Sequence, residues 1–270
     1  MPDRFVSGVH GDLEEAKRRW EIALRWRREH RIWEVLKEPR REFELLKKTF
    51  PTYICGRAKN DCPVLWERIG ESNILLLDTV ENLNEDDLVR HYLFHFEFLW
   101  GVVEPGVESK MITIEDVQGV GIRHLTLRLK NFVSYLSASV KPYYVDRCQK
   151  SYIINAPWVF SAVWKIISPF FDPRTREKVN ILGYDWLEEV LKDIDASQIP
   201  ESMGGTLQRE LHDSDEERKL RALVDKNNAA GASAAAAAAA AVKTPLEAKD
   251  APPQPPAASP EAATPPLVGS

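Results

Sequence analysis

The stretch from residue 150 to residue 183, KSYIINAPWVFSAVWKIISPFFDPRTREKVNILG, carries the strongest structural signals in the chain. Residues 152–155 and 179–182 are short apolar runs typical of strands. Between them, residues 159–168 have the periodicity of an amphipathic helix, which Pro169 ends. A strand, a helix and a second strand in this order predict two parallel strands joined by a helical crossover.

The same alternation extends outward in both directions from this unit. Further strands are expected at residues 64–68 and 111–116. Further helices are expected at residues 12–37, 40–48, 84–100, 125–140 and 186–194. The pattern predicts an α/β fold in which N-terminal helices precede a largely parallel sheet flanked by helices.

The composition divides the chain into four parts. Residues 1–50 read as a helical region, and residues 51–206 as the α/β lobe. Residues 207–226 form a charged helical segment. Residues 227–270 contain no aromatic residue and consist largely of Ala and Pro, so we expect them to be disordered.

Several classes of protein are excluded by composition. No run of about 18 apolar residues is long enough to span a bilayer, and the N-terminus lacks the apolar core of a signal peptide. Three cysteines cannot all pair, and their spacing makes no zinc site, which favours a reducing cytoplasm. The net charge is −5, and the mildly basic residues 1–60 lack the dense basic face of a nucleic-acid-binding protein.

Catalytic motifs are weak. His91 and His95 have the spacing of a zinc-protease helix, but Tyr92 stands where the catalytic Glu is needed. The 118–121 sequence QGVG lacks the third Gly of a dinucleotide fingerprint, because position 124 is His. No nucleophile elbow or Walker loop is present. We therefore expect neither a metal site nor enzymatic activity.

Two features of the 150–183 stretch allow more than one interpretation. Its large apolar residues suit either a core helix or a movable lid; they are Trp158, Phe160, Val163, Trp164, Ile167, Phe170 and Phe171. Thr175 and Lys178 are three residues apart near a helix N-terminus. They could hold a phosphate or polyol, or belong to a solvated first turn.

The order of short motifs resembles the CRAL-TRIO lipid-binding domains, a family that includes yeast phosphatidylinositol/phosphatidylcholine transfer proteins. The resemblance covers about residues 4–205. Its strongest parts are YYVDR at 143–147, YIINAPWVF at 152–160 and PFFDP at 169–173. Supporting parts are PVLWER at 63–68, EDVQG at 115–119, Ile199-Pro200 and Gly204-Gly205.

This resemblance implies one deep apolar pocket covered by a gate helix at about residues 158–171. It also implies that Thr175 and Lys178 grip a phosphatidylinositol headgroup. For phosphatidylcholine, Thr113 matches one of two expected hydroxyls, whereas Met111 replaces the other and Phe96 replaces a nearby Tyr. In the N-terminal region, which is shorter than in the family, Val9 and His10 replace a basic pair that helps bind inositol phosphate.

The expected function is therefore non-enzymatic binding and intermembrane transfer of a phospholipid, most simply phosphatidylinositol. Its setting would be the cytoplasm and, transiently, membrane surfaces, with no cofactor besides the lipid. One alternative is a lipid-sensing adaptor that recruits a protein partner through the Pro-rich residues 245–266. Another is a carrier of a different hydrophobic ligand, similar to tocopherol or a retinoid.

Overall fold

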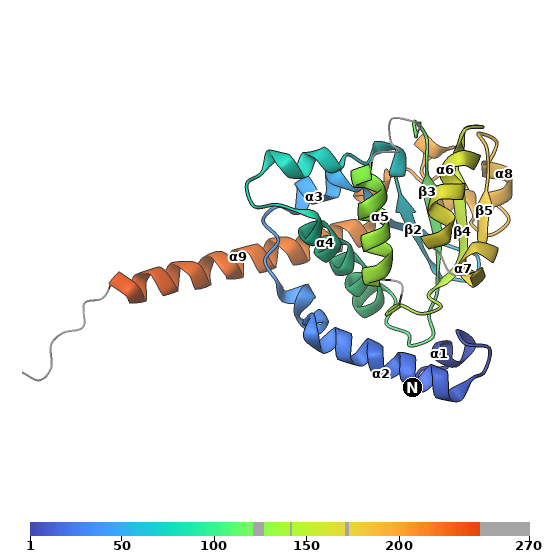
Figure 1. The fold of residues 1–270 in the computed structure, drawn as a ribbon. Coiled ribbons are helices and arrows are strands. Elements are labelled where there is room, and N and C mark those ends of the chain that lie inside the picture. The colour runs from blue at the N-terminus through green and yellow to red at the C-terminus, as the bar shows by residue number, and fades with distance from the viewer. Residues whose placement is uncertain (121–126, 141, 171–172, 244–270) are drawn as a thin grey trace, which may run out of the picture. The chain divides into compact units, whose positions relative to one another are not determined.

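The computed structural model describes residues 1–120, 127–140, 142–170 and 173–243. Its centre is a five-stranded sheet in the order β1-β2-β3-β4-β5 (Figure 1). The strands are β1 (Thr52–Arg57), β2 (Pro63–Glu67), β3 (Met111–Asp116), β4 (Cys148–Ile154) and β5 (Val179–Ile181). Strand β1 runs antiparallel to β2, and the other pairs are parallel. The predicted α/β fold with a largely parallel sheet is confirmed.

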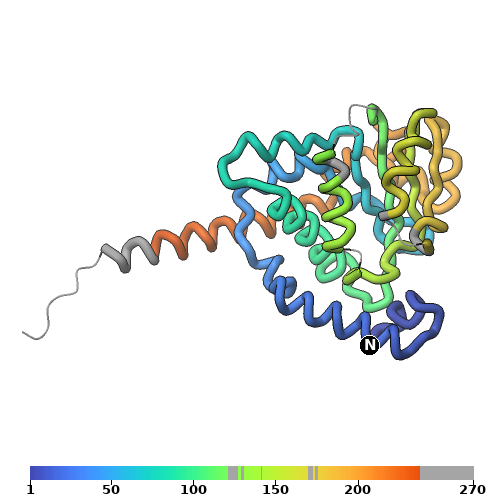
Figure 2. Tube along the Cα trace, viewed as in Figure 1, coloured from blue at the N-terminus to red at the C-terminus, as the bar shows by residue number. Residues whose placement is uncertain are grey.

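Three helical crossovers join the parallel strands. Helix α4 (Glu85–Phe98) lies between β2 and β3, α5 (Leu127–Val140) between β3 and β4, and α6 (Phe160–Ile167) with α7 (Pro173–Glu177) between β4 and β5. Because each crossover joins neighbouring strands with the usual right-handed sense, all of these helices belong to one face of the sheet. The path of the chain through α5 and α6 can be followed in Figure 2.

The opposite face of the sheet is filled by a continuous apolar core. Side chains from β2, β3 and β4 alternate onto it, and α8 (Leu187–Val190) packs over them. Trp66, Ile114 and Tyr152 are almost fully buried there. The predicted 186–194 helix is shorter than expected, because the chain after Leu191 turns toward the 3-10 segments that follow.

The N-terminal region consists of α1 (Asp3–Ser7), α2 (Leu13–Glu29), the 3-10 helix η1 (Ile32–Lys37) and α3 (Phe43–Thr49). Asp12, where the predicted helix begins, caps α2 and accepts from the backbone amide of Glu15 at 3.0 Å. The single helix predicted for residues 12–37 is wrong beyond Glu29. Arg31 adopts a left-handed conformation with φ of 49°, which interrupts the α-helical hydrogen bonds.

Helix α9 (Asp215–Lys243) differs from the expected division at residue 227. Its first part is held on the body by Leu220 and Val224, whose side chains enter the apolar core. Asn227 donates to the backbone carbonyl of Leu36 at 2.8 Å. A helix already formed extends easily into alanines, the best helix-forming residues, so it continues to Lys243. Residues 244–270 lie outside the described part of the chain.

Candidate functional site

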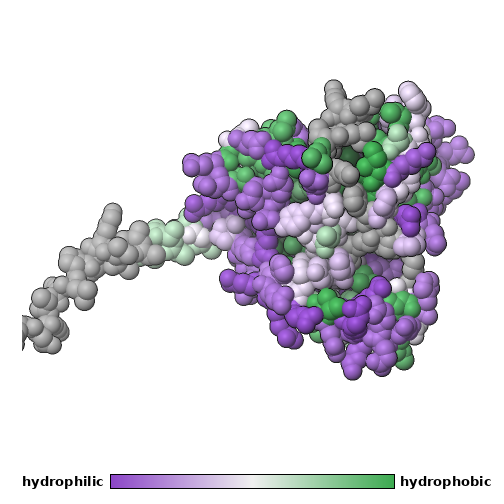
Figure 3. Space-filling model, viewed as in Figure 1, coloured by the Kyte–Doolittle hydropathy of each residue, from purple (hydrophilic) through white to green (hydrophobic). Residues whose placement is uncertain are grey.

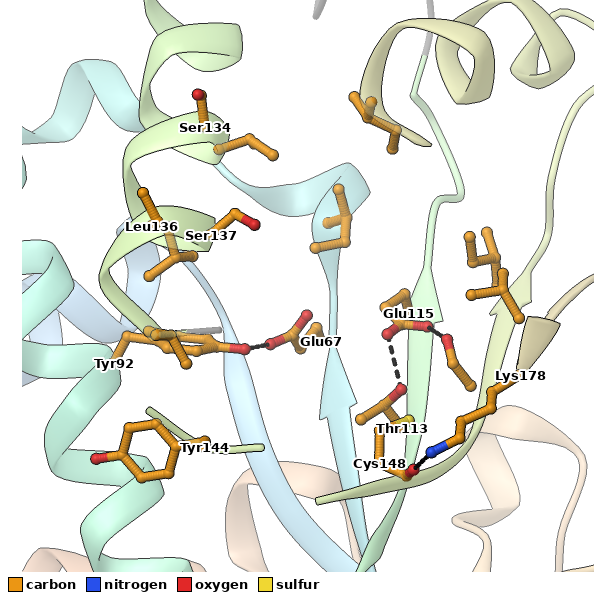
Figure 4. Close-up of a pocket in the computed structure, with 18 of the residues that line it drawn as sticks. Glu67, Tyr92, Thr113, Glu115, Ser134, Leu136, Ser137, Tyr144, Cys148 and Lys178 are labelled. Atoms are coloured by element: carbon orange, nitrogen blue, oxygen red, sulfur yellow. Dashed lines mark hydrogen bonds between the residues drawn. The ribbon is translucent and has the colours of Figure 1, made fainter. Parts of the chain in front are cut away.

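A cavity of about 1030 Å³ lies between the sheet and helices α5 and α6. Figure 4 shows the wall that α5 contributes and the strands that face it. The side chains of Ser134, Ser137 and Ala138 on α5 line this space. Because these residues are small, α5 does not fill the volume in front of the sheet, and the gap is large by the standard of ligand pockets.

Helix α6 forms an apolar wall of the cavity. Phe160, Val163, Trp164 and Ile167, all predicted to belong to a gate, line it. Trp158 precedes the helix and points away, with 92% of its surface exposed. Apolar residues gather in the region of α5 and α6 in the space-filling view (Figure 3).

The remaining two gate candidates cannot be placed on this wall. Phe170 belongs to the 3-10 helix η6 (Ser168–Phe170), but its side chain is not among those described. Phe171 lies outside the described residues.

Lys178 lies at one edge of the cavity, directly before β5. Its Nζ donates to Asp146 Oδ1 at 2.6 Å and to the backbone carbonyl of Cys148 at 2.7 Å. Thr175, its predicted companion, is on α7, and its side chain is not among those described. The structure therefore brings Lys178 to the cavity with a carboxylate partner that the sequence did not predict.

Asp146 connects this lysine to a second cation. Lys110 Nζ donates to the other carboxylate oxygen at 3.0 Å. Burial alone would raise the pKa of Asp146, but the hydrogen bonds from Lys178 and Lys110 hold it below its ordinary value. The carboxylate is thus ionised and holds the Lys178 ammonium in place at the cavity edge.

Thr113 lines the cavity from β3, but its hydroxyl is already engaged. It donates to Glu115 Oε1 at 2.8 Å, while Ser151 on β4 donates to Glu115 Oε2 at the same distance. Burial raises the pKa of Glu115, and the two hydroxyl donors act in the opposite direction. The hydroxyl predicted to contact phosphatidylcholine thus serves first to hold a carboxyl group.

A second carboxyl group, Glu67, stands beside Glu115 in the same wall. Glu67 ends β2, and its register partner on β3 is Glu115. Tyr92 on α4 donates its hydroxyl to Glu67 Oε1 at 2.5 Å. Burial and the neighbouring Glu115 raise the pKa of Glu67 to about 8.

The sequence contained a signal for these two acids, although the motifs did not single them out. Strands of a parallel sheet are covered on both faces, so their side chains are normally apolar throughout. Glu115 alternates with Thr113 and Met111 along β3, so the three residues share one face of the sheet. A Glu on such a face indicates a hollow and not a closely packed core. Asp146 offered no such signal, because only the fold brings it to Lys178.

The basic pair missing at Val9 and His10 has a partial counterpart in the structure. Val9 is buried in the small core of α1 and α2, and His10 is exposed in the turn between them. Arg18 and Arg19, on α2, line the cavity. Both bind Glu15, with nitrogen to oxygen distances of 2.6 and 2.7 Å.

The histidine pair of α4 belongs to the core. His95 accepts from Lys47 Nζ at its Nε2 atom, 2.9 Å away, and donates from Nδ1 to the carbonyl of His91. Burial lowers the pKa of both imidazoles. Lys47 in turn pairs with Glu217 of α9 at 2.7 Å, so this cluster joins three helices.

These observations define a class: an α/β domain with a large, mainly apolar cavity under an amphipathic helix and a few charged groups in its wall. The CRAL/TRIO domain matches residues 47–205, and the chain belongs to this family. A solved structure, that of Sfh5, resembles the chain with a TM-score of 0.61 and 21% identity, covering 77% of this chain and 75% of that one. That likeness supports the fold.

Curated relatives have informative names. The phosphatidylinositol/phosphatidylcholine transfer protein SFH12 of Arabidopsis thaliana is 30% identical over 211 residues, covering 75% of this chain and 38% of the relative. The SEC14 cytosolic factor of Candida glabrata is 28% identical over 213 residues, covering 75% of this chain and 68% of the relative. The chain thus spans just over a third of the Arabidopsis protein. In the described part of the chain, no helix is long and apolar enough to cross a membrane.

Proposed function

We propose that this protein binds a phospholipid, phosphatidylinositol, in its cavity and carries it between membranes without chemical change. The observation that carries the proposal is the cavity itself, which combines an apolar wall on α6 with the Lys178 ammonium at its edge. The names of its relatives support the same class of ligand.

The size and lining of the cavity suit acyl chains. Exposing one CH₂ group of a lipid to water costs about 0.8 kcal/mol, so a chain of about 16 carbons costs more than about 10 kcal/mol. A carrier must therefore offer a dry volume, and the cavity of about 1030 Å³ supplies one. The lipid is the only ligand that this function requires, and no cofactor enters it.

Lys178 supplies the charge for the headgroup in this proposal. A phosphate can share its ammonium with Asp146, and Arg18 and Arg19 add positive charge from α2 at the cavity wall. Thr175 would add a hydroxyl from the helix that precedes Lys178. Thr113, which belongs to the other headgroup prediction, would contact a ligand only beside Glu115.

Helix α6 is the gate in this proposal. Phe160, Val163 and Trp164 of this helix line the cavity, and Ile166, which also lines it, is 39% exposed. Such a helix can leave the cavity only where both faces remain in apolar surroundings, which a bilayer provides. The protein would therefore work in the cytoplasm and open at membrane surfaces.

The proposal is tested with Lys178→Ala in a vesicle-to-vesicle transfer assay with phosphatidylinositol. We expect transfer to fall at least tenfold, because the headgroup loses its cation. Lys110→Ala is the matched control: it removes a cation from the same Asp146 carboxylate, and we expect less than a threefold change. Normal transfer by Lys178→Ala would contradict the headgroup assignment.

Native mass spectrometry of the purified full chain tests binding itself. We expect one phospholipid per chain, and an empty protein under all loading conditions would refute the proposal. The adaptor alternative predicts a bound lipid and membrane recruitment without transfer. Its docking segment, residues 245–266, lies outside the described residues.

A further inference from the structure

Two carboxyl groups, those of Glu67 and Glu115, stand side by side inside the cavity. Glu67 and Glu115 are register partners on neighbouring parallel strands, whose backbones lie about 4.8 Å apart. Both side chains point into the cavity in Figure 4. The Glu67 residue is 8% exposed, so its carboxyl has little contact with bulk water.

Three hydroxyl groups around these acids donate to them. Thr113 and Ser151 donate to the two oxygens of Glu115, and Tyr92 donates to Oε1 of Glu67. The contacts of the described residues give Oε2 of Glu67 no donor. When the two carboxyl groups are ionised, the capacity that remains to them is for accepting hydrogen bonds, which suits a ligand that donates them.

Neither acid is paired with a cation in the described part of the chain. Within the described ranges, the ion pairs include neither Glu67 nor Glu115. Lys178, which lines the same cavity, is engaged with Asp146. A buried carboxylate without a partner is costly, and two adjacent ones repel each other, which is why the pKa of Glu67 is raised to about 8 and that of Glu115 is also raised. A resident counter-charge would remove both costs.

We propose that Glu67 and Glu115 form a second polar subsite in the cavity, which binds the primary ammonium group of an amine-bearing lipid. An ammonium carries three donors and no acceptor, which matches the free acceptor capacity of the wall. It also supplies the missing positive charge. A phosphate is repelled by the same two groups, so this subsite is separate from the one at Lys178. The inference rests on the proposed function in one respect: the cavity must admit a lipid.

The test compares two probes that differ only in their polar end, octadecylamine and octadecanol. Binding to the full chain, freed of lipid, is measured at pH 7.5, where the amine is protonated. We expect octadecylamine to bind at least tenfold more tightly than octadecanol. In the double variant Glu67→Gln, Glu115→Gln we expect amine binding to weaken at least tenfold and alcohol binding to change less than threefold.

Two controls separate this subsite from general effects. Glu81→Gln removes an exposed carboxylate on the surface and should leave both probes unaffected. The single variant Glu115→Gln keeps the Glu67 and Tyr92 contact, so it remains informative if the double variant fails to fold. Thermal unfolding of each variant checks that the protein is folded.

Each outcome decides a separate question. Equal binding of the two probes by the wild-type protein overturns the inference, as does amine binding that neither Glu variant weakens. If the wild-type protein binds both probes equally and the variants weaken both, the two acids recognise a hydroxyl group and not an ammonium. If phosphatidylinositol binds while octadecylamine does not, only this inference fails. If neither lipid binds, the proposed function fails first.

Discussion

The two faces of the central sheet are built from adjacent residues but serve different purposes. On β4, Ile154 points into the filled core under α8 and is fully buried, whereas Ile153 lines the cavity opposite. On β3, Ile114 and Glu115 divide in the same way. One face is close-packed and apolar. The other is hollow and carries carboxyl and hydroxyl groups.

This difference shows where the protein gains stability and where it forgoes it. Close packing against α8 gives each apolar side chain its full burial free energy. The face toward α5 gives up those contacts and adds the cost of two buried acids. The face of the sheet that lowers the stability of the protein is therefore the one that leaves space for a ligand.

The largest effect should come from comparing Ile154→Ala with Ile153→Ala. The same atoms are removed from adjacent residues, one in a filled core and one beside an existing cavity. We expect Ile154→Ala to lower the free energy of unfolding by about 4 kcal/mol and Ile153→Ala by about 2 kcal/mol, because only the first creates a new void. Urea unfolding of the lipid-free protein measures both. Equal losses would mean that the two faces are packed alike.

The sequence predicted the filled face and its strands well. The run MITIED gave the bounds of β3 without error, and the helix predicted to start at residue 84 does so, with Asn84 as its N-cap in a capping box with Asp87. Strand β1 was missed, because Gly56 and a short apolar run gave no alternation. Its place in the sheet depends on antiparallel pairing with β2, which no local pattern reveals.

The hollow face was predicted less completely. The aromatic periodicity of residues 159–168 located the α6 wall, and family resemblance selected Lys178. The pairing of Glu67 with Glu115 depends on the register of two strands separated by a whole helical crossover. Asp146 reaches Lys178 across 32 residues of sequence, which include another helical crossover. Sequence periodicity reports which face a residue occupies, but not which residue of another strand lies beside it.

The pH dependence of stability tests the cost of the acids. The pKa of Glu67, raised to about 8 from an ordinary 4.5, means that the folded state favours the neutral form. The stabilising contribution is complete below pH 4.5 and is lost as the pH rises through 8. A pKa that differs by one between the folded and unfolded states corresponds to about 1.4 kcal/mol, so the loss has an upper limit of about 5 kcal/mol. Only about two pH units of this loss fall between pH 6 and the folded-state pKa of about 8, which corresponds to at most about 2.7 kcal/mol, and we expect about 2 kcal/mol in that range.

The free energy of unfolding of the wild-type protein should therefore fall by about 2 kcal/mol relative to that of Glu67→Gln when the pH is raised from 6 to 9. The reason is that the amide does not titrate. Urea unfolding at the two pH values, without lipid, measures the difference. The exposed Glu81→Gln should show no such trend. A difference between Glu67→Gln and wild type that is the same at both pH values would show that Glu67 is ionised throughout, and that the wall is better solvated than its burial indicates.

The smallest effect on stability, but a specific one on membranes, is expected for Trp158→Ala. Trp158 is 92% exposed directly before α6, so removing it costs less than about 0.5 kcal/mol of unfolding free energy. An exposed indole beside an amphipathic helix suits the interface of a bilayer. We expect binding to phospholipid vesicles, measured by flotation, to fall about threefold. Trp33→Ala is the matched control, because Trp33 is 52% exposed on η1, away from the cavity wall, and its loss should leave vesicle binding unchanged. If both variants bind vesicles equally well, the hollow face meets the membrane through another element, and α6 acts only as a wall of the cavity.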